Sequence, residues 1–207
     1  MGRPETDRAQ RSAMTILGNA LADANYHEDA LSVDEARLSM LRRVGASEND
    51  LLTARGNLTC SYERLGRHEE ALSLRQEIYS GRLKLNGEEH LETLRAAYNY
   101  ALSLARLERF EEAKALLRKK IPVARRVCGE SHDLALRIGW TCAYALCRDP
   151  SATLDDLREA VTALEELERT ARRVLGGAHP TTVDIERALK HAQATLFVRE
   201  KQSSARP

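Results

Sequence analysis

The sequence has almost no excess of charge of either sign and no long apolar run. Its 32 basic and 31 acidic side chains leave a formal net charge of +1 at pH 7, so no overall field favours nucleic acid or an anionic membrane. No stretch is apolar over the roughly 20 residues that a membrane-spanning helix needs, and no charged-then-apolar leader opens the chain. These absences predict a cytoplasmic protein without nucleic-acid or membrane partners.

Cysteine is scarce and irregularly placed. A disulfide framework in a small secreted protein would show a regular pattern, so the scattered cysteines indicate reduced thiols in an intracellular protein. Cys142 and Cys147 are five residues apart on an expected helix and therefore point to different faces, which disfavours a shared metal or redox site. The cysteines are Cys60, Cys128, Cys142 and Cys147.

Motifs for catalysis and metal binding are also missing. The sequence has no glycine-rich phosphate loop, no nucleophile elbow and no dinucleotide-binding fingerprint. His27-Glu-Asp29 and His68-Glu-Glu70 begin like a zinc-protease helix, but Leu31 and Leu72 stand where the second histidine would have to be. We therefore expect a protein that is not an enzyme and that uses no cofactor and no metal.

What the sequence does contain is a helical hairpin that repeats with a period of 42 residues. The segment from Asn57 to Ala71 realigns with the segment from Asn99 to Ala113. The loop Gly87-Glu-Glu-His90 recurs as Gly129-Glu-Ser-His132 and again as Gly176-Gly-Ala-His179. A fixed period of this size indicates a stacked repeat array. The loop histidines would then lie in separate layers, where we expect them to brace hairpin junctions rather than to share a metal ion.

Apolar stripes at helical spacing predict a single elongated all-α domain. Pro122 should bend or interrupt the second helix of the third hairpin, and Thr153 with Asp156 fits a capping box at the start of the second helix of the fourth. Alanine recurs where the two helices of each hairpin cross, at Ala30, Ala71, Ala113 and Ala160. The predicted segments are a flexible lead-in at 1–11, a repeat region at 12–186 with hairpins at about 12–52, 53–94, 95–136 and 137–181, a capping helix at 182–200 and a disordered tail at 201–207.

The spacing of small, aromatic and leucine residues before Glu-Glu-Ala-Leu, as in Leu58 to Leu72, resembles the tetratricopeptide repeat. The 42-residue period and the loop from Val174 to Thr182 are similar to the longer repeats of kinesin light chains and of the many proteins that share this repeat type. The resemblance covers residues 12 to about 186 and implies a right-handed superhelical solenoid. It also implies a noncatalytic scaffold or adaptor with a concave groove for a peptide or partner helix. A sensor or regulatory arm of a larger signalling ATPase-type protein is the alternative.

The resemblance nominates asparagines as the groove residues that hold a peptide backbone. Asn57 and Asn99 match one asparagine of the family pattern, and Asn19 matches a second. An amide both donates and accepts hydrogen bonds, which suits binding that does not depend on the partner's side chains. Other groove positions depart from the pattern, so a standard carboxylate clamp is not expected. The alternative is that these asparagines brace the neighbouring repeat.

Arginine follows the same period. Arg64, Arg106 and Arg148 are 42 residues apart at the ends of the first helices, and Arg95 and Arg137 are 42 apart at their beginnings. Stacked helices would arrange them as two ladders suited to bidentate contacts with carboxylates. The ladders predict an acidic partner segment, and surface arginines that serve solubility are the alternative.

Two aromatic residues share one repeat position on the inner face. Tyr98 and Trp140 are 42 residues apart, and Gly56 holds the same position in the second hairpin. Aromatic residues beside such a gap suit an apolar anchor from a partner, although Trp140 could instead belong to the core. The sequence therefore predicts that the groove captures an acidic, partly apolar protein segment. The chain is expected to be a monomer or a weak homo-oligomer, because array ends bury apolar surface poorly.

Overall fold

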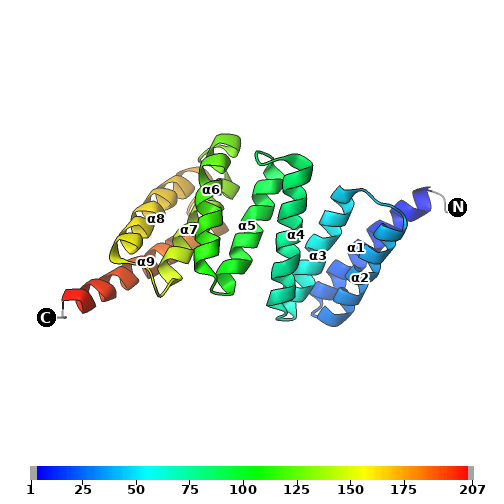
Figure 1. The fold of residues 1–207 in the computed structure, drawn as a ribbon, viewed down its shortest axis with the longest axis horizontal. Coiled ribbons are helices and arrows are strands. Elements are labelled where there is room, and N and C mark those ends of the chain that lie inside the picture. Colours follow the sequence, from blue (N-terminus) through cyan, green and yellow to red (C-terminus); the bar gives the residue numbers. More distant parts are fainter. Residues whose placement is uncertain (1–3, 205–207) are drawn as a thin grey trace. The chain divides into compact units, whose positions relative to one another are not determined.

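The computed structural model describes residues 4–204, and over that range the chain forms nine helices and no strand. The all-α fold of helix-turn-helix repeats predicted from the sequence is thereby confirmed. Within each of the two units of the chain, Figure 1 shows the helices following one another in chain order. The chain divides into two units, residues 1–85 and 86–207, and each is described by itself.

The first unit is built from two hairpins. α1 (Pro4–Asp23) and α2 (His27–Arg43) form the first, and α3 (Glu48–Arg64) and α4 (His68–Asn86) form the second. α2 packs against both α1 and α3. Leucines of α2 and α3 meet in a hydrophobic cluster that includes Leu31, Leu38, Leu41, Ala54 and Leu58.

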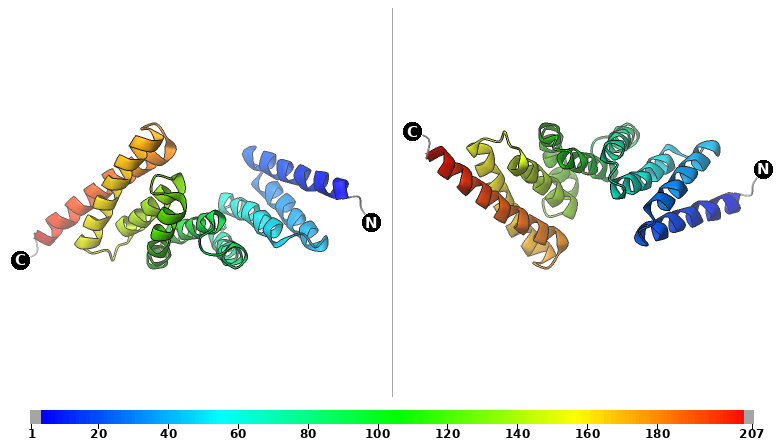
Figure 2. Two further views of the ribbon diagram at one scale, coloured as in Figure 1. Left: turned by 90° about the horizontal axis from the view of Figure 1, so that it is seen from above. Right: turned by 90° about the horizontal axis from the view of Figure 1, so that it is seen from below.

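The second unit contains two hairpins and a closing helix. α7 (Asp133–Arg148) is its centre, because it contacts α5, α6, α8 and α9. α9 lies along α7 and α8 in both views of Figure 2. The other helices are α5 (Leu91–Arg106), α6 (Phe110–Cys128), α8 (Leu154–Leu175) and α9 (Pro180–Ser204).

The recurring alanines are buried, as the predicted close helix crossings require. Because a side chain larger than a methyl group would push the two helices apart, the position demands alanine. All four are almost completely buried, with exposures of 0% or 1%, at Ala30, Ala71, Ala113 and Ala160.

The recurring loop histidines brace the hairpin junctions, as predicted. His90 Nδ1 accepts a hydrogen bond of 3.1 Å from the backbone N–H of Glu92, at the start of α5. His132 does the same for Leu134 at 3.1 Å, and His179 for the third copy at 3.2 Å. Each histidine satisfies a backbone donor that the first turn of a helix leaves without an intrahelical partner. The predicted capping box of Thr153 is also present, with both of its hydrogen bonds.

Several helix ends differ from the predicted positions. α1 begins at Pro4, inside the stretch expected to be a flexible lead-in, because proline at the first helical position loses no hydrogen bond. α9 continues to Ser204, beyond the predicted end at 200. Residues 1–3 and 205–207 of the predicted lead-in and tail lie outside the described residues. α5 and α7 begin four residues before the predicted hairpin boundaries at 95 and 137, since the histidine caps set their first turns.

Of the two predicted effects of Pro122, a bend or an interruption of its helix, the interruption does not occur. α6 is assigned as one helix from Phe110 to Cys128 with Pro122 inside it. Residues on either side of the proline, Leu117 and Val123, belong to the cluster that joins α5, α6 and α7. Tertiary packing of the flanking turns therefore holds the helix together across the missing donor.

Candidate functional site

Two of the nominated asparagines share a pocket in the first unit. Asn19 of α1 and Asn57 of α3 both line it, and it has a volume of about 340 Å³. Asn19 is exposed, whereas Asn57 is half-buried. Arg64, another nominated residue, lies in the same wall and forms an ion pair of 3.6 Å with Asp23 of α1. The structure thus brings three nominated residues from two helices to one place.

The wall of this first-unit pocket also contains a buried carboxylate. Asp34 of α2 is 6% exposed, and its Oδ2 accepts a hydrogen bond of 2.8 Å from the hydroxyl of Ser61. Burial raises the pKa of Asp34, while the hydrogen bond from Ser61 and the charge of Arg37 oppose that rise without cancelling it. A Cβ atom at Gly18 would lie 3.3 Å from Asp34 Oδ1, so glycine keeps that oxygen uncrowded.

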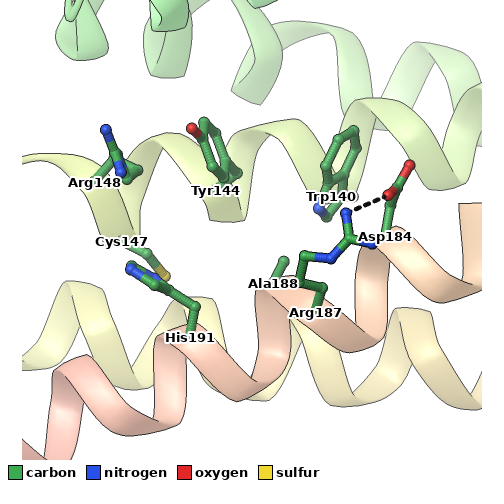
Figure 3. Close-up of a pocket in the computed structure, with 8 residues that line it drawn as sticks. All are labelled: Trp140, Tyr144, Cys147, Arg148, Asp184, Arg187, Ala188 and His191. Carbon is green, nitrogen blue, oxygen red and sulfur yellow. Dashed lines mark hydrogen bonds and ion pairs between the residues drawn. The ribbon is translucent and has the colours of Figure 1, made fainter.

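A second pocket, in the second unit, has an apolar wall (Figure 3). It has a volume of about 230 Å³ and lies between α7 and α9. The rings of Trp140 and Tyr144 follow one side of α7, with centroids 6.2 Å apart and planes inclined by 43°. Ala188 of α9 faces them, and Arg148 adds a positive charge at the end of α7. This pocket therefore pairs an aromatic surface with a cation.

The nominated arginines differ in their partners. Arg95 lies 3.6 Å from Glu92 and Arg137 lies 3.0 Å from Asp133, each an ion pair within its own helix. Burial acts to lower the pKa of Arg137, but the charge of Asp133, followed by Tyr98, outweighs it and raises the pKa. Arg106 is exposed near the end of α5. Arg148 is exposed, and no carboxylate of the described residues pairs with it.

Tyr98 does not lie on an open surface as the sequence suggested. It is 8% exposed and belongs to the hydrophobic cluster of α5, α6 and α7. Its repeat partner Trp140 is only partly buried, and it both packs against the core and lines the second-unit pocket. Tyr98 is therefore a core residue, and the aromatic wall of the second-unit pocket is formed by Trp140 and Tyr144 instead. Asn99 is half-buried on α5.

The thiols and histidines of the described residues form no metal or redox centre. No group of three or more histidine, cysteine, aspartate or glutamate side chains is arranged there to hold a metal ion. Burial raises the pKa of Cys142 and that of Cys147 to about 11, so both thiols are protonated at neutral pH. None of the described helices is long and apolar enough to cross a bilayer.

Sequence reasoning missed Asp34 and the contribution of α9. Asp34 carried a signal, because it interrupts the apolar stripe formed by Leu31, Leu38 and Leu41 on α2. A charged residue on a buried helix face needs a partner or a function. Ala188 and His191 of α9 had no such signal, since their position opposite Trp140 depends on how the closing helix packs on α7.

Comparison with known proteins agrees with this architecture. Residues 50–126 match the tetratricopeptide repeat family. This matched segment therefore carries tetratricopeptide repeats. Such repeats generally mediate protein–protein interaction and are typically noncatalytic. No curated protein sequence matches the chain.

Solved structures of tetratricopeptide-like repeats share the fold. Two structures of the nearly identical repeats of a candidate kinesin light chain from Podosopora anserina are 20% identical to this chain and cover 99% of it. Their TM-scores are 0.77 and 0.75, and 92% and 93% of those chains are covered. BtubC (BKLC) from P. vanneervenii is 15% identical, with a TM-score of 0.64 and coverage of 99% and 85%. The resemblance to kinesin light chain-like repeats is confirmed for the fold.

Proposed function

We propose that this tetratricopeptide-repeat protein is a noncatalytic adaptor that captures an acidic, partly apolar segment of a protein partner. The observation behind the proposal is the second-unit pocket, where an aromatic wall lies on α7 beside Arg148, an arginine with no ionic partner among the described residues. The aromatic wall would take an apolar side chain, and Arg148 would pair with a carboxylate next to it. Aromatic and arginine side chains supply most of the energy at protein interfaces.

The position of the arginines on the first helices supports an acidic partner. Arg106 of α5 and Arg148 of α7 stand at the same repeat position, and these two helices pack against each other. Arg137 already holds Asp133, so a partner carboxylate would have to share or replace that ion pair. Exposed ion pairs contribute only about 0 to 1 kcal/mol, so such an exchange costs little. Arg148 needs no exchange, and we expect it to contribute the most to affinity.

A peptide array probed with the intact chain tests this proposal. We expect enrichment of peptides that combine an aromatic or large aliphatic residue with nearby aspartate or glutamate. Arg148→Glu should reduce that enrichment about tenfold to a hundredfold, because a charge-assisted pair becomes a repulsion. Arg173→Glu is the matched control, since Arg173 is an exposed arginine on α8 outside the pocket.

Two array results would contradict the proposal. One is enrichment that ignores acidic residues, and the other is equal loss of binding in the Arg148 and Arg173 variants. A parallel Asn99→Ala variant tests the backbone contact in the second unit. It should weaken binding of all enriched peptides by a similar factor, because amide contacts to a backbone do not depend on side-chain identity.

A further inference from the structure

The first-unit pocket carries a negative charge, which would repel an acidic segment. Its wall contains two carboxylates, Asp23 and Asp34, and one guanidinium group, Arg64. Arg64 lies 3.6 Å from Asp23, so these two charges offset each other. The charge that remains in the wall is the carboxylate of Asp34. The pocket therefore favours a cation, whereas the second-unit pocket favours an anion.

Asp34 presents one free acceptor to this pocket. Asp34 is only 6% exposed, and from the residues that the structure describes only its Oδ2 atom accepts a hydrogen bond, from the hydroxyl of Ser61 at 2.8 Å. Among the described residues Oδ1 has no hydrogen-bond donor, and Gly18 leaves it uncrowded. Arg37 attracts Asp34 from one turn further along α2, but it makes no hydrogen bond to Asp34 and is not part of the wall. A buried carboxylate oxygen gains most from a charged donor.

The asparagines supply further acceptors in the same pocket. Asn19 and Asn57 line it from α1 and α3, and each side-chain amide has a carbonyl oxygen. Together with Asp34 Oδ1 they offer three acceptors, which is the number of donors on a lysine ammonium group. The ammonium is compact and sits on a flexible four-carbon stem, so it can enter this pocket of about 340 Å³, which α1, α2 and α3 line.

We infer that the first-unit pocket binds the ammonium group of a lysine side chain from a protein partner. Asp34 Oδ1 is the anionic acceptor, and the amide oxygens of Asn19 and Asn57 are the neutral ones. Because the lysine belongs to a partner, this site rests on the protein-binding function proposed above, but it lies in a different unit and selects the opposite charge. The partner segment would then carry a lysine in addition to its acidic, apolar part.

Amide NMR spectra of the intact chain test this assignment. The probe is a capped Ala-Lys-Ala peptide, and the matched control peptide has norleucine in place of lysine. We expect saturable shifts of the Asn19 and Asn57 side-chain NH₂ signals with the lysine peptide and none with the norleucine peptide. Asp34→Asn should weaken the response about tenfold to a hundredfold, because the charge-assisted hydrogen bond is lost. Asparagine can still accept the hydrogen bond from Ser61, so the variant should fold.

Three results would overturn the assignment. They are no response to lysine, an equal response to norleucine, and an unchanged affinity in the Asp34 variant. Titration with 1,4-diaminobutane separates a free amine from a partner side chain, since a response to the diamine alone would assign the pocket to a small polyamine. The peptide array tests the second-unit pocket with acidic peptides that contain an aromatic or large aliphatic residue, and these differ from the lysine peptide used here. Its failure and the failure of the lysine titration are therefore distinguishable.

Discussion

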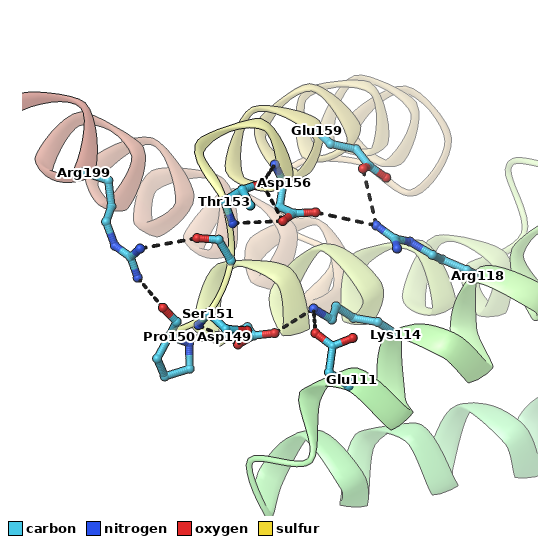
Figure 4. A network of polar contacts seen from close by, with 11 residues as sticks. Glu111, Lys114, Arg118, Asp149, Pro150, Ser151, Thr153, Asp156, Glu159 and Arg199 are labelled. Atoms are coloured by element: carbon cyan, nitrogen blue, oxygen red, sulfur yellow. Dashed lines mark hydrogen bonds and ion pairs between the residues drawn. The ribbon is translucent and has the colours of Figure 1, made fainter. Parts of the chain in front are cut away.

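Removal of the buried ammonium group of Lys114 should destabilise the second unit more than any surface substitution. Figure 4 shows Lys114 of α6 reaching the carboxylate of Asp149, at the turn that follows α7, as well as Glu111 on its own helix. The Lys114 and Asp149 side chains are only 7% and 6% exposed, and their Nζ and Oδ2 atoms are 2.7 Å apart. Asp149 also accepts hydrogen bonds from the backbone N–H and hydroxyl of Ser151, at 2.8 and 2.6 Å. Lys114 therefore joins α6 to the turn that begins the fourth hairpin's second helix.

Lys114→Met keeps the aliphatic stem but leaves the Asp149 carboxylate buried without its cation. Breaking a buried ion pair by removing one partner costs about 3 to 5 kcal/mol. We expect about 3 kcal/mol, the lower end, because the two hydrogen bonds from Ser151 remain. Urea unfolding followed by tryptophan fluorescence measures this loss within the second unit, since Trp140 is the only tryptophan of the chain.

A double variant and a surface control decide between this explanation and simple loss of packing. Lys114→Met with Asp149→Asn should be more stable than Lys114→Met alone, because the uncompensated charge is gone. Lys119→Met, on the exposed side of α6, should change the free energy of unfolding by less than about 0.5 kcal/mol. The reasoning is refuted if Lys114→Met costs no more than the Lys119 control, or if the double variant is less stable than the single one.

Three further predictions follow from burial and charge. Ala113→Leu should cost about 1 to 3 kcal/mol in urea unfolding, because Ala113 is 0% exposed where two helices cross; a cost near zero would mean that the crossing can open. Burial raises the pKa of Asp149, but hydrogen bonds from Lys114 and Ser151 outweigh it and hold the pKa well below its usual range. The ion pair therefore stabilises the fold above pH ~3.9, and the stability gap between wild type and Lys114→Met should shrink as the pH falls below that value in acid unfolding curves. At pH 8 a thiol reagent should modify the exposed Cys60 well before the buried Cys142, whose pKa burial raises to about 11; equal rates would contradict this difference.

The sequence predicted the fold well because each repeat needs the same residue types at the same positions, so these residues recur at a fixed spacing. Ala71 and Ala113 recur since a helix crossing leaves no room for a larger side chain, and His90 and His132 recur since each caps the next hairpin. Such local requirements can be read from spacing alone. The continuity of α6 across Pro122 could not be predicted from the sequence, because the packing of α6 against its neighbours outweighs a single missing hydrogen bond.

The sites were less predictable because they depend on which side chain meets which. The repeat spacing equates Tyr98 with Trp140, but the first lies in the core and the second lines a pocket. The same spacing equates Arg137 with Arg95 and says nothing of Asp133, which pairs with Arg137. For Asp34 the sequence showed the residue but not its partner. A charged residue within an apolar stripe can be seen in the sequence, but its position beside Ser61 depends on the packing of α2 on α3.

The most direct test of the account is a fluorescence titration of Trp140 with a peptide that contains one aromatic residue flanked by aspartates. Wild type and the Arg173→Glu control should show the same saturable change in emission, and Arg148→Glu should need about tenfold to a hundredfold more peptide to reach it. That result would place the apolar anchor and the carboxylate at the second-unit pocket. Peptide binding that leaves the emission of Trp140 unchanged, or that is equally tight in the Arg148 variant, would contradict the proposed adaptor site.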